Sequence, residues 1–491
     1  MASKEQQIKN SFIYLLPMIA GNILPIIIIF VFTRILTKED FGVLALAQIY
    51  ALFVTGLANF GMTVVYDRNY FQYRENCQKT AQLLYSTLFF VTVNFLLFAI
   101  ITYLFRGILS KLIIGSAEFG DILFWAFCGQ FFYTVINYYL AYFKNSEIAK
   151  NFAFYKVGCI FLNLIIALLL VAWLDVGVIG LVYAQFFAGV ITFGILSYKF
   201  ITILPPSFNK TILYESLKIG YPLTPSIFFG VIGTQFDKYM IGLLKSVGGV
   251  GIYSIGQQVA NVIFIYMTAI QNVFSPEVYR RMFDLGEKGG DAVGKYLTPF
   301  VYVSISLALM ISLFSEEVIS CLTPQSYHQA IDVVIILSMF YGSLFFGKQP
   351  QLIFAKKTYI STLLHMVSIA LNILINIPFI MRWGMIGAAW ATLLAGLISG
   401  LILFFVSQHY YEIKWEYKKI GIIYLIFFAS SIILLLMRNF FIAYEFRLIV
   451  KCSLTFFYIY LGIKLKIITM GNYTLIRNMI PLGRAVTSDH I

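Results

Sequence analysis

The chain alternates between about fourteen apolar runs, each near 20 residues long, and short polar connections. About 20 apolar residues in an α-helix cross the hydrocarbon core of a bilayer. Only 12% of the residues are charged and 60% are hydrophobic, whereas soluble domains carry about 25% charged residues. The sequence therefore predicts an all-α polytopic membrane protein. The expected spans are 11–32, 41–66, 80–105, 120–143, 153–174, 178–199, 215–244, 250–274, 296–315, 328–349, 359–381, 385–407, 418–437 and 443–465.

The basic residues indicate orientation and not a nucleic-acid partner. The chain has 35 Lys and Arg against 22 Asp and Glu, but most of the positive charges lie in alternate short connections between the apolar runs. Positive charge marks the cytoplasmic side of a membrane protein. Both termini are therefore expected in the cytoplasm. The five cysteines are scattered without metal-ligand spacing, so neither a disulfide nor a cysteine metal site is expected.

The chain also repeats itself. Gly177-Val178-Ile179-Gly180 recurs as Gly384-Met385-Ile386-Gly387, and small residues follow at the same spacing in both copies. Such repeats predict two homologous six-helix lobes with a substrate path between them and two additional helices. The predicted boundaries are 1–205 for the N-terminal lobe, 206–410 for the C-terminal lobe, 411–470 for the last two helices and 471–491 for a cytoplasmic tail. Further matches pair Leu162-Asn163 with Leu371-Asn372, Phe41-Gly42 with Val250-Gly251, Gln48 with Gln257, and Pro17 with Pro222.

Polar side chains within three apolar runs are candidates for a cation site. A charge at mid-membrane depth costs roughly 2.5–3.5 kcal/mol on insertion scales, so the position of Asp237 indicates a functional role. Counted along their spans, the candidates reach similar depths in the outer half of the membrane. Their carboxylate, amide, hydroxyl and carbonyl oxygens suit Na⁺, and Asp237 alone suits a proton. Hydrogen bonding between helices is the alternative. The candidate set is Asp237, Asn372, Asn376, Ala388 and Thr392.

Five cations form a second candidate group. Basic side chains in a low-dielectric cavity attract anionic phosphate strongly. Because most of these residues are near predicted span ends, snorkelling of their long side chains to the lipid headgroups is the alternative. The group comprises Arg34, Lys144, Lys218, Lys238 and Lys348.

Three stretches carry a resemblance to a known family. They are FDKYMIGLLKSVGGVGIYSIGQQ, its first-lobe counterpart FTRILTKEDFGVLALAQ, and LNILINIPFIMRWGMIGAAWAT. Together with the repeat, they resemble the Wzx-type O-antigen and capsule flippases of the multidrug/oligosaccharidyl-lipid/polysaccharide exporter superfamily. The resemblance covers essentially the whole chain, and it is more specific to the superfamily than to the substrate.

The resemblance implies a function. The chain would flip an undecaprenyl-pyrophosphate-linked oligosaccharide repeat unit across the bacterial inner membrane by cation-coupled alternating access. It would not be an enzyme, would need no cofactor beyond a coupling H⁺ or Na⁺, and would act as a monomer beside a polysaccharide polymerase and a chain-length regulator. Related lipid II flippases have a sodium site that carries over to the candidate cation set. Asn376 stands where they have a second acid, which leaves one formal charge fewer.

Three alternatives remain open. A lipid II flippase would carry Arg and Asp in the middle of the first span, where this chain has Asn22 nearby. A multidrug or cation antiporter would need acids facing its cavity, whereas here bases exceed acids. A membrane polymerase would need a long outer loop or a cluster of catalytic acids. Glu316-Glu317 is the acidic pair in the outer connections, and it is expected to lie in a solvated loop.

Overall fold

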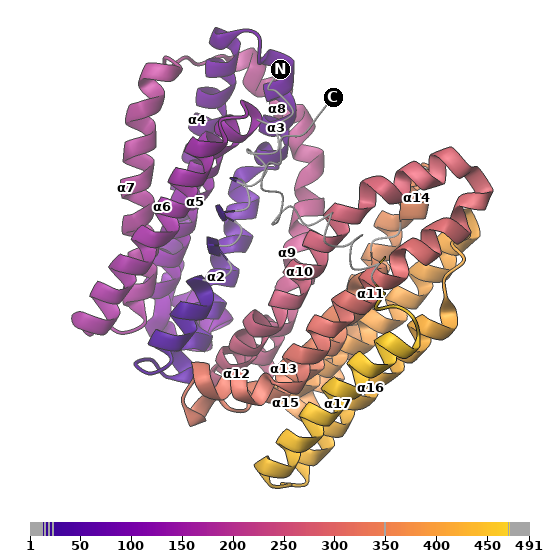
Figure 1. The fold of residues 1–491 in the computed structure, drawn as a ribbon. Helices are drawn as coiled ribbons and strands as arrows, with labels where there is room; N and C mark the ends of the chain where they lie inside the picture. Colours follow the sequence, from indigo (N-terminus) through magenta and orange to yellow (C-terminus); the bar gives the residue numbers. More distant parts are fainter. Residues whose placement is uncertain are drawn as a thin grey trace, which may run out of the picture. The chain divides into compact units, whose positions relative to one another are not determined.

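The structure is a computed structural model that describes residues 13, 16–17, 20–21, 24–347, 350–469 and 471. The described residues form helices and connections without a β-strand (Figure 1). They divide into two compact units. The N-terminal unit comprises Met1–Ser254 with Leu322–Pro324, and the C-terminal unit comprises Ile255–Cys321 with Gln325–Ile491. The lobe boundaries expected from the repeat stay a prediction.

In the N-terminal unit, the first described residues, 13, 16–17, 20–21 and 24–32, are helical. Its long helices are only weakly amphipathic, as expected for membrane helices, whose outward faces are also apolar. The remaining elements are α2 (Lys38–Asn59), α3 (Met62–Tyr73), α4 (Cys77–Ile113), α5 (Gly120–Asn145), α6 (Ala149–Ala167), the π-helical η2 (Leu168–Trp173), α7 (Ile179–Ile203), α8 (Lys210–Gly220), η3 (Tyr221–Leu223), α9 (Thr224–Leu244) and the start of α10 (Val247–Leu285).

The C-terminal unit continues from α10. Its elements are η4 (Gly286–Lys288), α11 (Gly289–Leu313), α12 (Ser315–Leu322), η5 (Gln325–Tyr327), α13 (Ala330–Ser343), η6 (Leu344–Gly347), α14 (Pro350–Phe354), α15 (Thr358–Tyr410), α16 (Tyr417–Asn439) and α17 (Tyr444–Lys464).

Polar caps set where several helices begin. At α2, the Thr37 hydroxyl accepts a hydrogen bond from the Asp40 backbone N–H at 3.2 Å, and the Asp40 carboxylate accepts one from the Thr37 N–H at 2.9 Å. This reciprocal capping box satisfies two N–H groups that the helix leaves unpaired. Asn76 and Asn209 cap α4 and α8 with their side-chain oxygens. Because each of these helices begins directly after its capping residue, the connections before them are only a few residues long.

Ten helices in the described residues are long and apolar enough to span a membrane. One of them, α15, contains two of the expected spans. The expected spans at 11–32, 215–244 and 328–349 overlap helical residues 24–32, the bent α8–α9 pair and the shorter α13. All fourteen expected spans therefore overlap helices, which confirms the all-α polytopic fold. The expected tail 471–491 lies outside the described residues, apart from Gly471.

The repeated Gly-x-x-Gly motif has the same structural role in both copies. Gly177 and Gly384 both have positive φ, at +76° and +60°, a backbone conformation that glycine adopts without steric cost. A Cβ on Gly387 would overlap the carbonyl oxygen of Phe379, so the chain turns back tightly on itself at Gly384. Thus α15 is two packed helices joined at a glycine.

Each lobe also contains the same kind of packing contact. Gly189 of α7 faces Phe132 of α5, and a Cβ at Gly189 would come within 2.7 Å of the Phe132 Cβ. The repeat-related Gly396 of α15 likewise meets the ring of Phe340 on α13. In both lobes a glycine lets a large aromatic ring sit against the neighbouring helix backbone. The two copies of the sequence repeat therefore share this packing contact.

An ion network attaches the last two helices to the C-terminal unit. Lys451 of α17 is fully buried, and its Nζ contacts Glu316 Oε2 at 3.0 Å and Glu317 Oε1 at 2.7 Å. Arg447 pairs with the same Glu316 at 2.5 Å. Arg438 of α16 pairs with Asp332 of α13 at 2.9 Å. The expectation that Glu316-Glu317 lies in a solvated loop is therefore wrong, because both acids belong to α12 and neutralise buried cations.

Candidate functional site

The candidate site centres on Asp237 in α9. Asp237 is only 9% exposed, although the helix around it is largely apolar. The Tyr253 hydroxyl donates a hydrogen bond to Asp237 Oδ2 at 2.8 Å, and Tyr253 is itself fully buried. A hydrogen bond to a charged group offsets part of the cost of burying it. Asp237 is thus held in a defined position inside the N-terminal unit.

The turn between α9 and α10 brings this pair together. Asp237 lies eight residues before Lys245, and Tyr253 lies eight residues after it. Because both helices rise by 1.5 Å per residue, the two side chains reach the same depth, roughly 12 Å from the turn. The Gly-rich start of α10 makes the turn compact, since the Gly249 N–H donates to the Ser246 hydroxyl at 3.1 Å.

The start of α10 also crosses α2 at very short range. A Cβ on Gly42 would overlap the Val247 carbonyl, and a Cβ on Gly251 would overlap the Lys38 carbonyl. Gly42 and Gly251 are repeat partners, and the carbonyl that each meets lies four residues before the other glycine. The crossing is therefore pseudo-symmetric. It fixes α2 against the start of α10, the helix that carries Tyr253.

Lys238 follows Asp237 on α9 but has different surroundings. It is half-buried, and its Nζ donates to Gln235 Oε1 at 3.3 Å. Successive helical residues point about 100° apart, which separates the ammonium from the neighbouring carboxylate. The sequence-based hypothesis gave the two charges different roles, and their different hydrogen-bond partners are compatible with it.

The other predicted phosphate-binding cations lie at helix ends or on surfaces. Arg34 is exposed after the first helix, donates to the Leu322 carbonyl at 3.2 Å and stacks on Phe30. Lys144 at the end of α5 pairs with Asp67 at 2.9 Å. Lys218 of α8 is exposed. Lys348 lies outside the described residues. A phosphate role for these cations stays a prediction.

Lys218 borders a hollow rich in aromatic side chains. Its Nζ lies 4.5 Å from the centre of the Tyr214 ring. The hollow has a volume of about 420 Å³ and is polar only at Lys218 and Asn94 and at the tyrosine hydroxyls. Aromatic faces beside a cation can contact both sugar rings and phosphate. The lining residues are Phe60, Phe90, Asn94, Tyr214, Leu217, Lys218 and Tyr221.

Two bent spans meet next to this hollow. Gly61 starts α3 with φ +69°, and a Cβ there would lie 2.7 Å from the Gly220 carbonyl oxygen. A Cβ on Gly220 would in turn lie 2.6 Å from the Phe60 carbonyl oxygen. The Phe60 and Tyr221 rings stack with centroids 6.5 Å apart. The break between α2 and α3 therefore packs against the break between α8 and α9.

The remaining four cation candidates lie in α15. Asn376 Nδ2 donates to Asn372 Oδ1 at 3.0 Å, and Thr392 Oγ1 donates to the Ala388 carbonyl at 3.0 Å. Asn376 and Ala388 are fully buried. Asn376 lies eight residues before Gly384 and Thr392 eight after it, so the two pairs reach similar depth in the α15 hairpin. These residues belong to the C-terminal unit and Asp237 to the N-terminal unit. The five-residue site stays a prediction.

Sequence reasoning missed two polar features of the N-terminal unit. Tyr253 was not singled out, although its position opposite Asp237 across the turn could be counted from the sequence. A chain of amides was also missed: Gln48 of α2 donates to Gln185 of α7 at 2.7 Å, and Gln185 donates to Gln130 of α5 at 3.3 Å. Gln48 was recognised only as a repeat partner of Gln257. Glutamine in apolar helices signals such interhelical bonds.

Comparison with known proteins places the chain in a family. The family model described as "Polysaccharide biosynthesis protein" matches residues 8–278, which is more than half of the chain. The chain belongs to this polysaccharide biosynthesis family. The matched region contains the Asp237–Tyr253 pair, the α2–α10 crossing and the aromatic hollow. This match agrees with the expected relationship to proteins of polysaccharide synthesis.

A curated relative agrees with this assignment. The chain is 24% identical over 222 residues to a probable low-salt glycan biosynthesis flippase, Agl15, of Haloferax volcanii. This match covers 44% of the chain and 46% of the relative, so the chain spans about half the length of that relative.

Two solved structures share the fold. One is the lipid II flippase MurJ in an inward closed conformation, with a TM-score of 0.57 and 15% identity, covering 90% of this chain and 99% of that one. The other is an inward-facing multidrug resistance transporter of the MATE family, with a TM-score of 0.59 and 14% identity, covering 81% and 94%. This family member is thus a multi-pass membrane protein with a transporter fold.

Proposed function

We propose that this family member is a flippase for a polyprenyl-pyrophosphate-linked oligosaccharide repeat unit. It would move the repeat unit from the cytoplasmic to the outer leaflet of a bacterial inner membrane during O-antigen or capsule synthesis. The family assignment and the named glycan flippase among its relatives support transport over an enzymatic activity. The observation that carries the mechanism is the buried, hydrogen-bonded carboxylate of Asp237.

Asp237 would bind the coupling ion. Acids inside membrane helices characteristically mark ion and proton pathways. The other candidates from the sequence, Asn372, Asn376, Ala388 and Thr392, would add neutral oxygens, a set suited to Na⁺. Without the second acid, the site carries a single formal negative charge. One proton or one Na⁺ neutralises it, and neutralisation lowers the cost of moving the site between conformations.

The cations and the aromatic hollow would contact the substrate. Lys238 is half-buried beside Asp237, and Lys218 lies among tyrosine and phenylalanine rings. Pyrophosphate is an anion that such lysines attract in a low-dielectric environment. Arg34, Lys144 and Lys348 complete the proposed phosphate-binding group. A polysaccharide polymerase and a chain-length regulator are the proposed partners of a monomeric transporter with both termini in the cytoplasm.

Transport in proteoliposomes tests the coupling role. The purified chain is reconstituted with a fluorescent lipid-linked oligosaccharide, and outward movement is measured under an imposed Na⁺ or H⁺ gradient. Asp237→Asn should abolish gradient-dependent movement. Asp291→Asn, which alters an exposed acid at the start of α11, is the matched control. Transport by Asp237→Asn at the wild-type rate would rule out the ion role.

Lipid II flipping is the second candidate, because the MurJ fold covers most of this chain. The same proteoliposomes loaded with lipid II instead of the oligosaccharide lipid separate the two substrates. We expect movement of the oligosaccharide lipid at least about tenfold faster, a difference of about 1.4 kcal/mol in the barrier. Faster movement of lipid II would favour the second candidate.

A further inference from the structure

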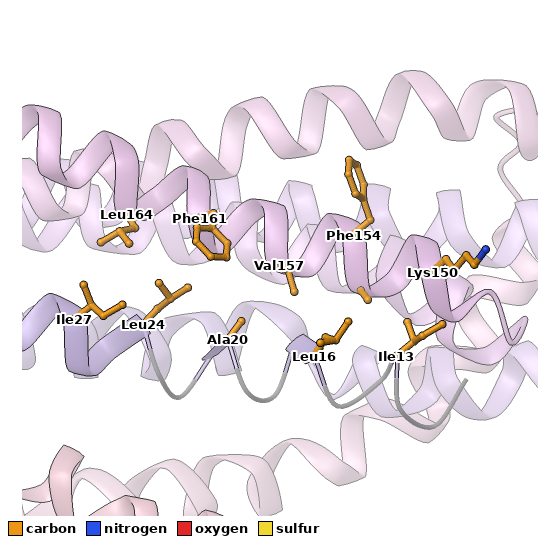
Figure 2. Close-up of a pocket in the computed structure, with 11 residues that line it drawn as sticks. Ile13, Leu16, Ala20, Leu24, Ile27, Lys150, Phe154, Val157, Phe161 and Leu164 are labelled. Atoms are coloured by element: carbon orange, nitrogen blue, oxygen red, sulfur yellow. The ribbon is translucent and has the colours of Figure 1, made fainter. Parts of the chain in front are cut away.

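An apolar groove runs between the N-terminal segment and α6 inside the N-terminal unit. Figure 2 shows the side chains that line it, with Ala20 and Leu24 facing Val157 and Phe161 across the groove. Its volume is about 650 Å³. Every lining residue is apolar except Lys150, which lies at one end (Figure 2). None of the predicted phosphate or cation residues contributes to it.

The groove is long and narrow. Its α6 wall runs from Lys150 through Ala153 and Val157 to Leu164, at intervals of three to seven residues that keep one helix face toward the opposite wall. The fourteen helical steps from Lys150 to Leu164 correspond to about 21 Å of helix, or most of a bilayer's hydrocarbon thickness. The small side chain of Ala20 leaves room in the middle (Figure 2). The groove therefore fits a single extended hydrocarbon chain.

Charge at one end of the groove distinguishes it from an ordinary lipid-facing surface. Lys150 is exposed at the start of α6, on the side that the sequence predicts to be cytoplasmic. Lys156 and Lys199 lie on α6 and α7, and they donate to the neutral groups of Asn137 and Tyr155 at 3.2 and 3.3 Å. Lys156 lies six residues beyond Lys150, about 9 Å along the helix, so Lys150 is the charge among the lining residues at the end of the groove. An anionic headgroup at Lys150 would complement it.

We propose that this groove binds the polyprenyl chain of the lipid-linked substrate, with its pyrophosphate at Lys150. The inference rests on the proposed function. It adds a binding place for the polyprenyl part of the substrate. A polyprenyl pyrophosphate joins one long, methyl-branched chain to an anion, which matches one apolar groove ending at a cation. A bilayer phospholipid carries two chains on one phosphate and would leave one of them outside the groove.

Photo-crosslinking tests the occupant in the full-length purified protein. The photoreactive residue p-benzoylphenylalanine is placed at Phe161 in the groove, or at Ile165, which faces outward on the same helix and does not line the groove. Radiolabelled polyprenyl pyrophosphate is the probe. Position 161 should be labelled about tenfold more than position 165, and unlabelled polyprenyl pyrophosphate should compete while phosphatidylglycerol should not. Equal labelling of the two positions, or equal competition by phosphatidylglycerol, would overturn the proposal.

Two substitutions test the apolar groove and its charged end separately. Ala153→Trp fills the groove and Lys150→Gln removes its charge, and each should weaken binding of the probe about tenfold. The matched controls are Ile165→Trp and Lys210→Gln, which should bind like the wild type. Each variant is first checked for an unchanged melting temperature, and Ala153→Val replaces Ala153→Trp if the tryptophan variant does not fold.

The transport assay separates this inference from the proposed function. If the wild type moves the oligosaccharide lipid while Ala153→Trp and Lys150→Gln bind and move it equally well, the groove proposal fails and the flippase proposal stands. If the wild type neither binds nor moves any polyprenyl-linked glycan, the flippase proposal fails, and the groove proposal fails with it.

Discussion

Single residues show how this chain tolerates polar groups inside apolar helices. Asp237 accepts a hydrogen bond from the Tyr253 hydroxyl, and Lys451 forms ion pairs with two glutamates. Removing one partner of such a pair leaves the other buried without compensation, which costs more than the pair itself contributes. The partners of buried charges are therefore as informative as the charges themselves.

Tyr253→Phe should impair the Asp237 site without changing its shape. The lost hydrogen bond to a charged acceptor is worth about 1.5–3 kcal/mol, so gradient-driven transport should fall at least tenfold. In a double-mutant cycle, Asp237→Asn with Tyr253→Phe should be no worse than Asp237→Asn alone, because the two residues act as one unit. Tyr198→Phe, at an exposed tyrosine of α7, is the control. Gradient-driven transport by Tyr253→Phe at the wild-type rate would contradict a role for this hydrogen bond.

Gly384 should be far less tolerant of alanine than Gly400 in the same α15. Gly384 has φ +60° and ψ −135°, a region that is costly for any residue with a Cβ. A methyl group at Gly400 would meet no atom within 4 Å, and Gly400 lies in regular helix. Unfolding experiments in detergent should show Gly384→Ala destabilised by about 1–3 kcal/mol. Gly400→Ala should be neutral or stabilised by up to about 1 kcal/mol. Equal stability of the two variants would mean that the α15 turn adapts to a side chain.

At the scale of elements, backbone contacts through glycine decide which helices pack closely. The α2–α10 crossing, the paired breaks at Gly61 and Gly220, and the Gly189–Phe132 contact all use a missing Cβ. Close backbone approach is the main source of packing attraction between helices in lipid, where the hydrophobic effect does not drive them together. These contacts fix how the helices of the N-terminal unit pack against one another.

Alanine at either glycine of the α2–α10 crossing should separate the two helices. Gly42→Ala and Gly251→Ala each place a methyl group against a backbone carbonyl and should cost about 1–3 kcal/mol of stability. The double variant should cost less than the sum, because one separation relieves both clashes. Gly158→Ala and Gly194→Ala, where a methyl group meets open space, are the controls. Thermal unfolding of the purified protein measures these effects, and additive losses would argue against a shared crossing.

The ion network on α12 should make stability depend on pH. Burial alone would raise the pKa of Glu316, but hydrogen bonds and positive charge from Arg447 and Lys451 outweigh burial and hold the pKa below its usual 4.5. A lowered folded-state pKa gives stability that is present above pH 4.5 and is lost as the pH falls through the folded-state value. The melting temperature of the wild type should therefore fall in this acidic range more steeply than that of Glu316→Gln. Glu118→Gln, at an exposed acid before α5, should follow the wild type.

For the whole molecule, the sequence predicts the periodic features well and the paired contacts poorly. Hydropathy identifies the spans, and the repeat identifies Gly177 and Gly384 before their backbone angles are known. The Asp237–Tyr253 bond depends on the length of a turn, and the role of Glu316 depends on Lys451, which is distant in the sequence. A carboxylate in a short polar connection has the same local pattern whether it is solvated or paired, so the sequence alone favoured the wrong environment for Glu316.

The orientation of the whole molecule follows from its positive charges and can be tested directly. Because basic residues concentrate in alternate connections, the α5–α6 connection at Glu147 should be cytoplasmic and the α4–α5 connection at Glu118 should be external. Single cysteines replacing these exposed glutamates in a cysteine-free background are treated with a membrane-impermeant maleimide in intact cells. Glu118→Cys should be labelled at once, and Glu147→Cys only after permeabilisation. This orientation would also place Lys150 at the cytoplasmic leaflet, from which the proposed substrate starts. The opposite labelling pattern would contradict the predicted topology. It would also contradict binding of the polyprenyl chain from the cytoplasmic leaflet beside Lys150.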